Sequence, residues 1–220
     1  MQEIVLDTET TGIYVKDGHR IVEIGCIELD NLIPTKNKFH CYLNPERKVS
    51  EKAFEVHGYS DEFLSKQKKF SEVAEDFLEF IKDNRLIIHN AEFDLAHLNN
   101  ELDLFGKNKL QNEIVDTLTL ARNKYPGSQV SLDSLCKRFR IDNSRRTYHT
   151  ALIDCDLLAK VYINLLDQKE PTLNFKQNLQ TEEFQNIKLK YNKKVILPSS
   201  EELSKHKEYL KNYLKKNFFN

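Results

Sequence analysis

Three short segments of this chain carry side chains that could do chemistry together. They are residues 7–10 at the end of an apolar run, residues 89–94 near the middle, and residues 149–154 further on. Between them they supply four carboxylates and one imidazole: Asp7, Glu9, Asp94, Asp154 and His149. No single segment is decisive, whereas the set points to one kind of chemistry.

That chemistry is metal-dependent hydrolysis of a phosphodiester. Carboxylate oxygens are the ligands that hard cations such as Mg²⁺ and Mn²⁺ prefer. Two such ions about 4 Å apart can stabilise both the attacking and the leaving oxygen of an in-line displacement. A histidine, with an ordinary pKa of about 6.5, can take a proton from the attacking water at neutral pH. Four carboxylates and one histidine are what a two-metal hydrolase of this kind requires.

Asp7 and Glu9 follow an expected strand over residues 3–7. Alternate side chains of a strand point to the same face, so these two acids would lie about 7 Å apart on one side. The sequence Thr10-Thr11-Gly12 breaks the strand and places both acids at its end, where active sites of sheet proteins commonly lie. The alternative is a turn residue at 7 and a solvated one at 9, which explains poorly why both acids share a face.

The other three candidates have stronger structural alternatives when each is taken alone. Asp94 falls in the first turn of an expected helix, where any acid interacts well with the helix dipole. His149 could be a capping or surface residue. Asp154 interrupts an apolar helical stripe formed by residues 158, 161 and 165. Because a carboxylate on a core-facing stripe is costly unless it is paired or bound to metal, Asp154 is the acid that most requires a functional explanation.

Length and composition describe an ordinary globular chain with an appendage. It has 220 residues, of which 40% are hydrophobic and 30% charged. No apolar run approaches the about 20 residues that cross a bilayer, and residues 1–4 lack the pattern of a signal peptide. The four cysteines lack CxxC spacing, so we expect a reduced, cytoplasmic protein without a zinc site. Net charge divides into −6 before residue 176 and +5 from there on, which suggests two roles on one chain.

Apolar periodicity predicts an α/β fold, a mixed sheet flanked by helices. The expected strands cover residues 3–7, 20–29, 38–43, 86–89 and 114–117, the first three as an antiparallel meander. The expected helices cover residues 71–82 with Ser71 as N-cap, 92–104, 131–139 capped by Ser131, and 151–166.

The pattern changes after residue 167, so we predict three parts: a catalytic domain over 1–167, a flexible linker over 168–194 and a C-terminal segment over 195–220. The linker is rich in Gln, Asn, Lys and Glu with few apolar anchors. Weak helical periodicity returns over 199–214. The alternative for this last part is a frayed basic tail.

These residues, in this order, resemble the DEDDh family of 3′–5′ exonucleases. The HxxxxD spacing of His149 and Asp154 is that of its histidine-containing branch. The similarity covers about residues 2–166 and extends to the proofreading ε subunits of bacterial DNA polymerase III. The segments that carry it are 5–12, 21–25, 53–58, 131–136 and 141–144.

The resemblance implies a ribonuclease H-like five-stranded fold with two Mg²⁺ or Mn²⁺ ions held by the four carboxylates, and His149 as general base. It implies release of 5′-mononucleotides from a DNA 3′ end, single-stranded or mispaired. Besides Asp7, Glu9 and Asp154, it implies four substrate contacts: Thr10, Lys52, His57 and Phe93. Relatives can carry an acid at position 52, so a lysine there departs from the pattern and could instead meet a phosphate.

The resemblance also implies partners. Residues 195–220 look similar in kind to the segment that docks on the polymerase α subunit, while residues 170–175 weakly resemble a sliding-clamp motif with Glu170 where Gln is usual. A small accessory subunit is a further candidate, and no membrane is expected. Two other hypotheses remain: a free-standing DEDDh exonuclease that trims RNA or short oligonucleotides, and a non-catalytic scaffold, against which the intact ligand set argues.

Overall fold

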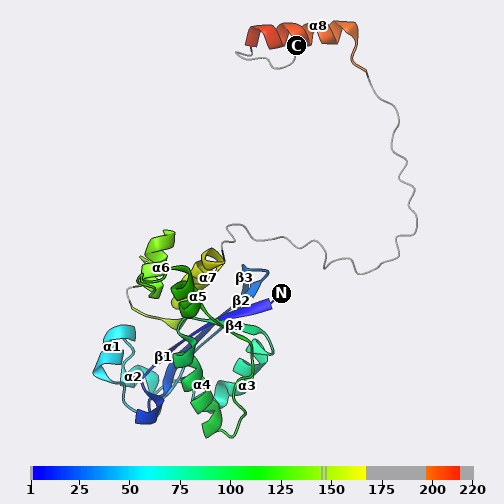
Figure 1. Ribbon diagram of the computed structural model, residues 1–220. Coiled ribbons are helices and arrows are strands. Elements are labelled where there is room, and N and C mark those ends of the chain that lie inside the picture. Colours follow the sequence, from blue (N-terminus) through cyan, green and yellow to red (C-terminus); the bar gives the residue numbers. More distant parts are fainter. Residues whose placement is uncertain (1, 145, 147, 167–196, 214–220) are drawn as a thin grey trace, which may run out of the picture. The chain divides into compact units, whose positions relative to one another are not determined.

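A computed structural model of the chain describes residues 2–144, 146, 148–166 and 197–213. The chain divides into two units, Met1–Phe175 and Lys176–Asn220, and each is described by itself (Figure 1). The predicted linker at 168–194 and the clamp-like residues 170–175 lie outside the described residues.

The first unit is built on a five-stranded sheet with strand order β3-β2-β1-β4-β5. The strands are β1 (Gln2–Thr10), β2 (Ile21–Asp30), β3 (Ile33–Tyr42), β4 (Arg85–Ile88) and β5 (Ile114–Asp116). The first three are antiparallel neighbours, whereas β4 runs parallel to β1 and β5 parallel to β4. The predictions of an antiparallel meander and of a mixed sheet are therefore confirmed.

Seven helices and one 3₁₀ turn are described in this unit. They are η1 (Val15–Asp17), α1 (Glu51–His57), α2 (Asp61–Leu64), α3 (Phe70–Ile81), α4 (Ala91–Leu104), α5 (Thr117–Lys124), α6 (Leu132–Phe139) and α7 (Ala151–Leu165). The four predicted helices are present as α3, α4, α6 and α7, with Ser131 capping α6 as expected. Ser71 as N-cap was wrong: α3 begins at Phe70, and the Glu72 carboxylate accepts from the backbone N–H of Lys69 at 2.8 Å.

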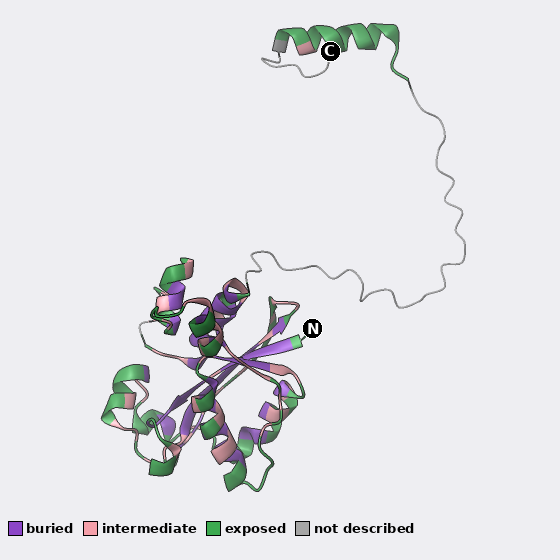
Figure 2. Cartoon of the chain, viewed as in Figure 1, coloured by how far each residue is buried: buried purple, intermediate pink, exposed green. Residues whose placement is uncertain are grey.

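Helices cover both faces of the sheet, and β1 contributes to both cores (Figures 1 and 2). Ile4 and Leu6 pack with residues of α3 and α4, whereas Val5 packs with residues of α5, α6 and α7. Because strand side chains alternate between faces, Asp7 and Glu9 share the face of Val5. The topology thus directs both acids toward α7.

The second unit contains α8 (Ser200–Tyr213), close to the helix predicted over 199–214. Its apolar side chains Leu203 and Tyr209 are exposed. Among the residues that the structure describes, no helix is both long and apolar enough to span a membrane.

Candidate active site

Asp7 and Glu9 lie within β1, which stays regular through Glu9 before its pairing with β2 shifts at Thr10. Burial raises the pKa of Asp7 well above its usual range, and neighbouring carboxylates, first that of Asp94, raise it further. Burial and the charges of Asp154 and Glu23 raise the pKa of Glu9 to about 8. The strand end is therefore a concentration of negative charge that a cation would stabilise.

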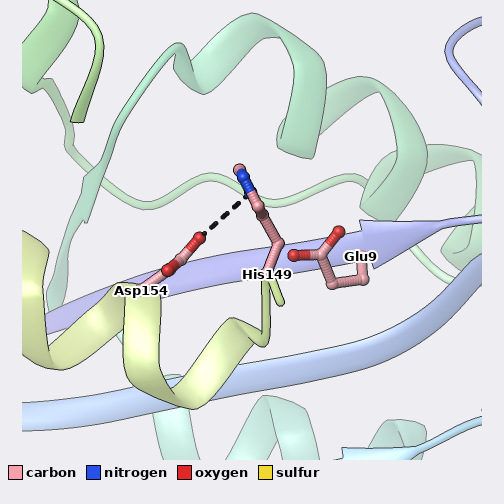
Figure 3. A group of neighbouring side chains, drawn as sticks. All are labelled: Glu9, His149 and Asp154. Carbon is pink, nitrogen blue, oxygen red and sulfur yellow. Dashed lines mark ion pairs between the residues drawn. The ribbon is translucent and has the colours of Figure 1, made fainter. Parts of the chain in front are cut away.

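Asp154 and His149 reach the same place from α7 and the loop before it (Figure 3). Asp154 is buried in the first turn of α7, and its Oδ2 lies 3.5 Å from His149 Nδ1. One ligand atom from each of Glu9, His149 and Asp154 can be chosen so that all lie within 4.8 Å of one another. Residues 140 positions apart in the sequence are thus brought together.

The absence of a side chain at Gly25 allows the first turn of α7 to pack directly against the backbone of β2. A Cβ atom at Gly25 of β2 would lie 2.6 Å from the carbonyl carbon of Ala151, so only glycine fits there. The Cys155 thiol donates to the carbonyl oxygen of Gly25 at 3.2 Å. These contacts set the height of the first turn of α7 above β2 and hence the position of Asp154.

Asp94 approaches the strand end from α4. Its Oδ1 accepts hydrogen bonds from the backbone N–H and the hydroxyl of Thr8, at 3.0 and 2.6 Å. Burial raises the pKa of Asp94 to about 7, although the two Thr8 bonds oppose this shift. Asp94 is thereby fixed to Thr8, the β1 residue between Asp7 and Glu9, and among the neighbouring charges that of Asp94 raises the pKa of Asp7 most.

Arg146 is part of this cluster and was not predicted. Its guanidinium donates to both oxygens of Asp154, each at 2.6 Å, and to Asp133 at 2.7 Å. It also donates to His149 Nδ1 at 2.8 Å. Burial, followed by the Arg146 charge, lowers the pKa of His149 below its usual value. Nothing in the spacing distinguishes Arg146 from other basic residues of the chain, so only the fold reveals it.

Glu23 is the second residue that was missed. It is completely buried in β2 directly opposite Glu9, and it accepts three hydrogen bonds from distant segments. The signal that could have found it is an acid in the middle of the Ile/Val-rich run over 20–29, where a solvated side chain is not expected.

A pocket of about 400 Å³ opens beside Glu9. All four predicted substrate contacts line it: Thr10, Lys52, His57 and Phe93. The His57 ring accepts a hydrogen bond from the backbone N–H of Tyr59 at its Nδ1, and burial lowers the pKa of His57. The neutral ring therefore carries its proton on Nε2. Most of the lining is apolar, which suits the flat faces of a base or sugar.

The donor set fits divalent metal ions. It consists of carboxylate oxygens with one imidazole nitrogen nearby. Burial raises the pKa values of Asp7, Glu9 and Asp94, and for Asp7 and Glu9 the charges of neighbouring carboxylates raise them further. Oxygen-rich sites of this kind suit Mg²⁺ or Mn²⁺ rather than softer ions. Three other acids at or near this end of the sheet have structural roles: Asp116 caps α5, Asp133 binds Arg146, and Asp156 pairs with Lys160.

Comparison with known proteins agrees with this geometry. The RNase T exonuclease family matches residues 4–162. The chain is 46% identical to DNA polymerase III subunit epsilon of Rickettsia felis, over 98% of each chain. It is 40% identical to the protein of the same name from Haemophilus influenzae, over 98% of this chain and 91% of that one.

Solved structures show the same fold. The nuclease domain of 3′hExo, a DEDDh family member bound to rAMP, superposes with a TM-score of 0.67 over 76% of this chain and 92% of that one, at 18% identity. Exonuclease X in complex with 5′ overhanging duplex DNA gives a TM-score of 0.61 at 22% identity, over 76% of this chain and 92% of that one. The ribonuclease H-like expectation is thus confirmed. The chain belongs to the RNase T/DEDDh exonuclease family and, within it, to the ε subunits of DNA polymerase III, which are proofreading 3′–5′ exonucleases.

Proposed function

We propose that this exonuclease cleaves the terminal phosphodiester with two Mg²⁺ or Mn²⁺ ions held by Asp7, Glu9, Asp94 and Asp154, and with His149 as general base. The observation that carries the proposal is the approach of ligand atoms of Glu9, His149 and Asp154 to within 4.8 Å of one another, with Glu9 also lining a pocket of about 400 Å³. When bound, the ions would polarise the scissile phosphate and stabilise the developing negative charge.

His149 is suited to remove a proton from water because its lowered pKa keeps the ring neutral at pH 7 to 8. In the structure, Arg146 donates to Nδ1, so the ring proton sits on Nε2. Proton uptake at Nδ1 then requires the Arg146 contact to open. The half-exposed position of the His149 side chain leaves room for that movement.

The pocket supports a terminal nucleotide as the bound group. Phe93 and the apolar wall can contact its base or sugar, while His57 Nε2–H and the Lys52 ammonium offer donors to oxygen atoms. We propose that Lys52 meets a phosphate, in place of the acid that some relatives carry.

Partners belong to the proposal as well. The DNA 3′ end would enter the pocket, and residues 195–220, which include α8, would dock on the polymerase α subunit in the cytoplasm. The net charge of −6 before residue 176 supports this assignment of partners, because an acidic nuclease unit would depend on a partner for most of the DNA contacts. Use of the clamp-like residues 170–175 and of a small accessory subunit stays a prediction.

The test is release of labelled mononucleotides by the full chain from DNA primers with paired and mispaired 3′ ends, and from RNA. We expect faster release from the mispaired end, no release in EDTA, loss in Asp7→Ala and a sharp reduction, about a hundredfold or more, in His149→Ala. Glu92→Gln, an exposed acid of the same helix as Asp94, is the matched control and should keep full activity. Activity that persists in EDTA would refute the metal site, and a preference for RNA would favour a trimming nuclease.

A further inference from the structure

Glu23 is a buried carboxylate that the proposed chemistry does not use. It is 0% exposed and is the third residue of β2, paired in register with Glu9 of β1. A charge removed from water in this way is costly unless hydrogen bonds replace the water. Glu23 has three such bonds, and each comes from a different part of the fold.

The first bond reaches the catalytic helix. The Oε2 atom of Glu23 accepts from the backbone N–H of Ala151 at 3.0 Å. Ala151 is the first residue of α7, two positions after His149 and three before Asp154. Its N–H has no partner within the helix, so the carboxylate satisfies this donor and interacts favourably with the positive end of the helix dipole. Glu23 therefore fixes the start of α7 to β2.

The second bond reaches the wall of the nucleotide pocket. The same Oε2 accepts from the Tyr59 hydroxyl at 2.8 Å. The ring of Tyr59 stacks on that of His57 at 4.8 Å, and its backbone N–H holds His57 Nδ1 at 3.0 Å. The orientation of His57 in the pocket thus depends on a side chain that Glu23 holds.

The two segments also contact each other directly. The backbone N–H of His149 donates to the carbonyl oxygen of Val56 at 3.1 Å. Segments 54–59 and 148–153 face each other across a cavity of about 630 Å³. The third donor to Glu23, His40 Nε2 at 2.7 Å from Oε1, anchors the carboxylate to β3 and leaves Oε2 for the other two.

We propose that Glu23 is a positioning residue that couples the pocket wall at His57 to the segment carrying His149 and Asp154. One oxygen atom holds both, so a displacement of either segment is felt by the other. The inference rests on the proposed roles of those residues, because coupling matters to the reaction only if they bind substrate and act on it.

Two substitutions at position 23 distinguish the hydrogen bonds from the negative charge: glutamine keeps the bonds and removes the charge, whereas leucine removes both. The amide oxygen of Glu23→Gln can accept from Tyr59 and Ala151, while its NH₂ group donates to His40 Nε2 in the neutral tautomer. Glu23→Leu removes all three bonds at similar volume. Glu3→Leu is the matched control. Glu3 is also a buried sheet carboxylate with a tyrosine donor, Tyr162 at 3.0 Å. It lies near the start of β1, at the opposite end of that strand from Glu9.

Amide hydrogen exchange of the full chain tests the anchor without using activity. We expect exchange in residues 148–152 to be about tenfold or more faster in Glu23→Leu, and close to wild type in both Glu23→Gln and Glu3→Leu. Equal protection of this segment in Glu23→Leu and wild type would overturn the proposal. If Glu3→Leu loosened the segment as much, the effect would be general destabilisation and the proposal would equally fail.

Kinetics test the coupling itself. We expect Tyr59→Phe to lower kcat about threefold to tenfold in the wild-type background and to have no further effect in Glu23→Leu. Independent, multiplicative effects would overturn the coupling. The His149→Ala control distinguishes the two claims: it should reduce activity about a hundredfold or more while leaving exchange in 148–152 unchanged. Full activity of that variant would refute the proposed base, and the exchange data would still decide the role of Glu23.

Discussion

At the scale of single residues, the site is built from charges that oppose folding. Asp7 lies among four other carboxylates that each raise its pKa. Removing its charge should relieve this repulsion, so we expect Asp7→Asn to stabilise the metal-free protein by about 1 kcal/mol or more while abolishing nuclease activity. Urea unfolding in EDTA measures the first effect. Glu92→Gln removes an exposed acid that interacts favourably with the dipole of α4, so this variant should not be more stable than wild type. A less stable Asp7→Asn would contradict the repulsion argument.

The same acids predict how stability depends on pH. The folded chain raises the pKa of Glu9 from 4.5 to about 8 and that of Asp94 from 3.8 to about 7. Between these limits the folded state binds more protons than the unfolded state, so stability must fall as the pH rises. We expect the free energy of unfolding in EDTA to drop by about 2 kcal/mol or more from pH 5 to pH 8.

Divalent ions should change this dependence, because a bound cation replaces the protons as the counter-charge. The measurement is urea unfolding at several pH values, in EDTA and in excess Mn²⁺. The double variant Glu9→Gln/Asp94→Asn should flatten the profile in EDTA. Stability that rises with pH in EDTA would show that the carboxylates do not interact as the structure indicates.

From the sequence, the candidate catalytic groups are easier to identify than the groups that hold them in place. Asp7 and Glu9 share a face because the side chains of a strand alternate between faces, and Asp154 is conspicuous as a charge on an apolar helical stripe. All three residues could therefore be found from the local sequence pattern. Arg146 could not be found in this way, and for Glu23 the sequence offers only an acid within an apolar strand, without its partners. Glu23 meets Ala151 across 128 residues of sequence, and the environment of Arg146 exists only after α6 and α7 have packed.

At the scale of elements, the critical contact is the approach of α7 to β2. We expect Gly25→Ala to reduce stability by about 2 kcal/mol and activity by more than tenfold, since its Cβ would force Ala151, and with it Asp154, away from the sheet. Gly106→Ala is the control. Gly106 has a φ of +65° but open space around it, so that variant should lose about 1 kcal/mol of stability and keep its activity. Thermal unfolding and mononucleotide release check both.

The elements that the sequence missed are short or continuous with another element. α1 and α2 contain seven and four residues, too few for apolar periodicity to appear, although Ser50 and Ser60 cap them. α5 follows β5 without a loop, and Asp116 is at once the last residue of the strand and the cap of the helix. Longer elements such as α7 were predicted because their buried faces repeat over several turns.

At the scale of the whole molecule, the chain consists of two units, and we propose that they carry different functions. The first holds all the candidate catalytic residues. The second carries α8, whose Leu203 and Leu210 are seven positions apart and so lie on one face of the helix. Attachment of such a segment to a polymerase would raise the local concentration of the nuclease at a primer end to about millimolar levels.

This division predicts that binding and catalysis can be separated. A chain truncated after residue 167 should release mononucleotides from a short oligonucleotide at a rate within about twofold of the full chain, because the hydrophobic cores and the site lie before that point. It should fail to co-purify with the polymerase α subunit. Within the full chain, Leu203→Glu/Leu210→Glu should abolish binding by charging the apolar face of α8, whereas Glu208→Gln on the other face should not. Co-purification of the truncated chain at wild-type levels would place the docking surface on the nuclease unit instead.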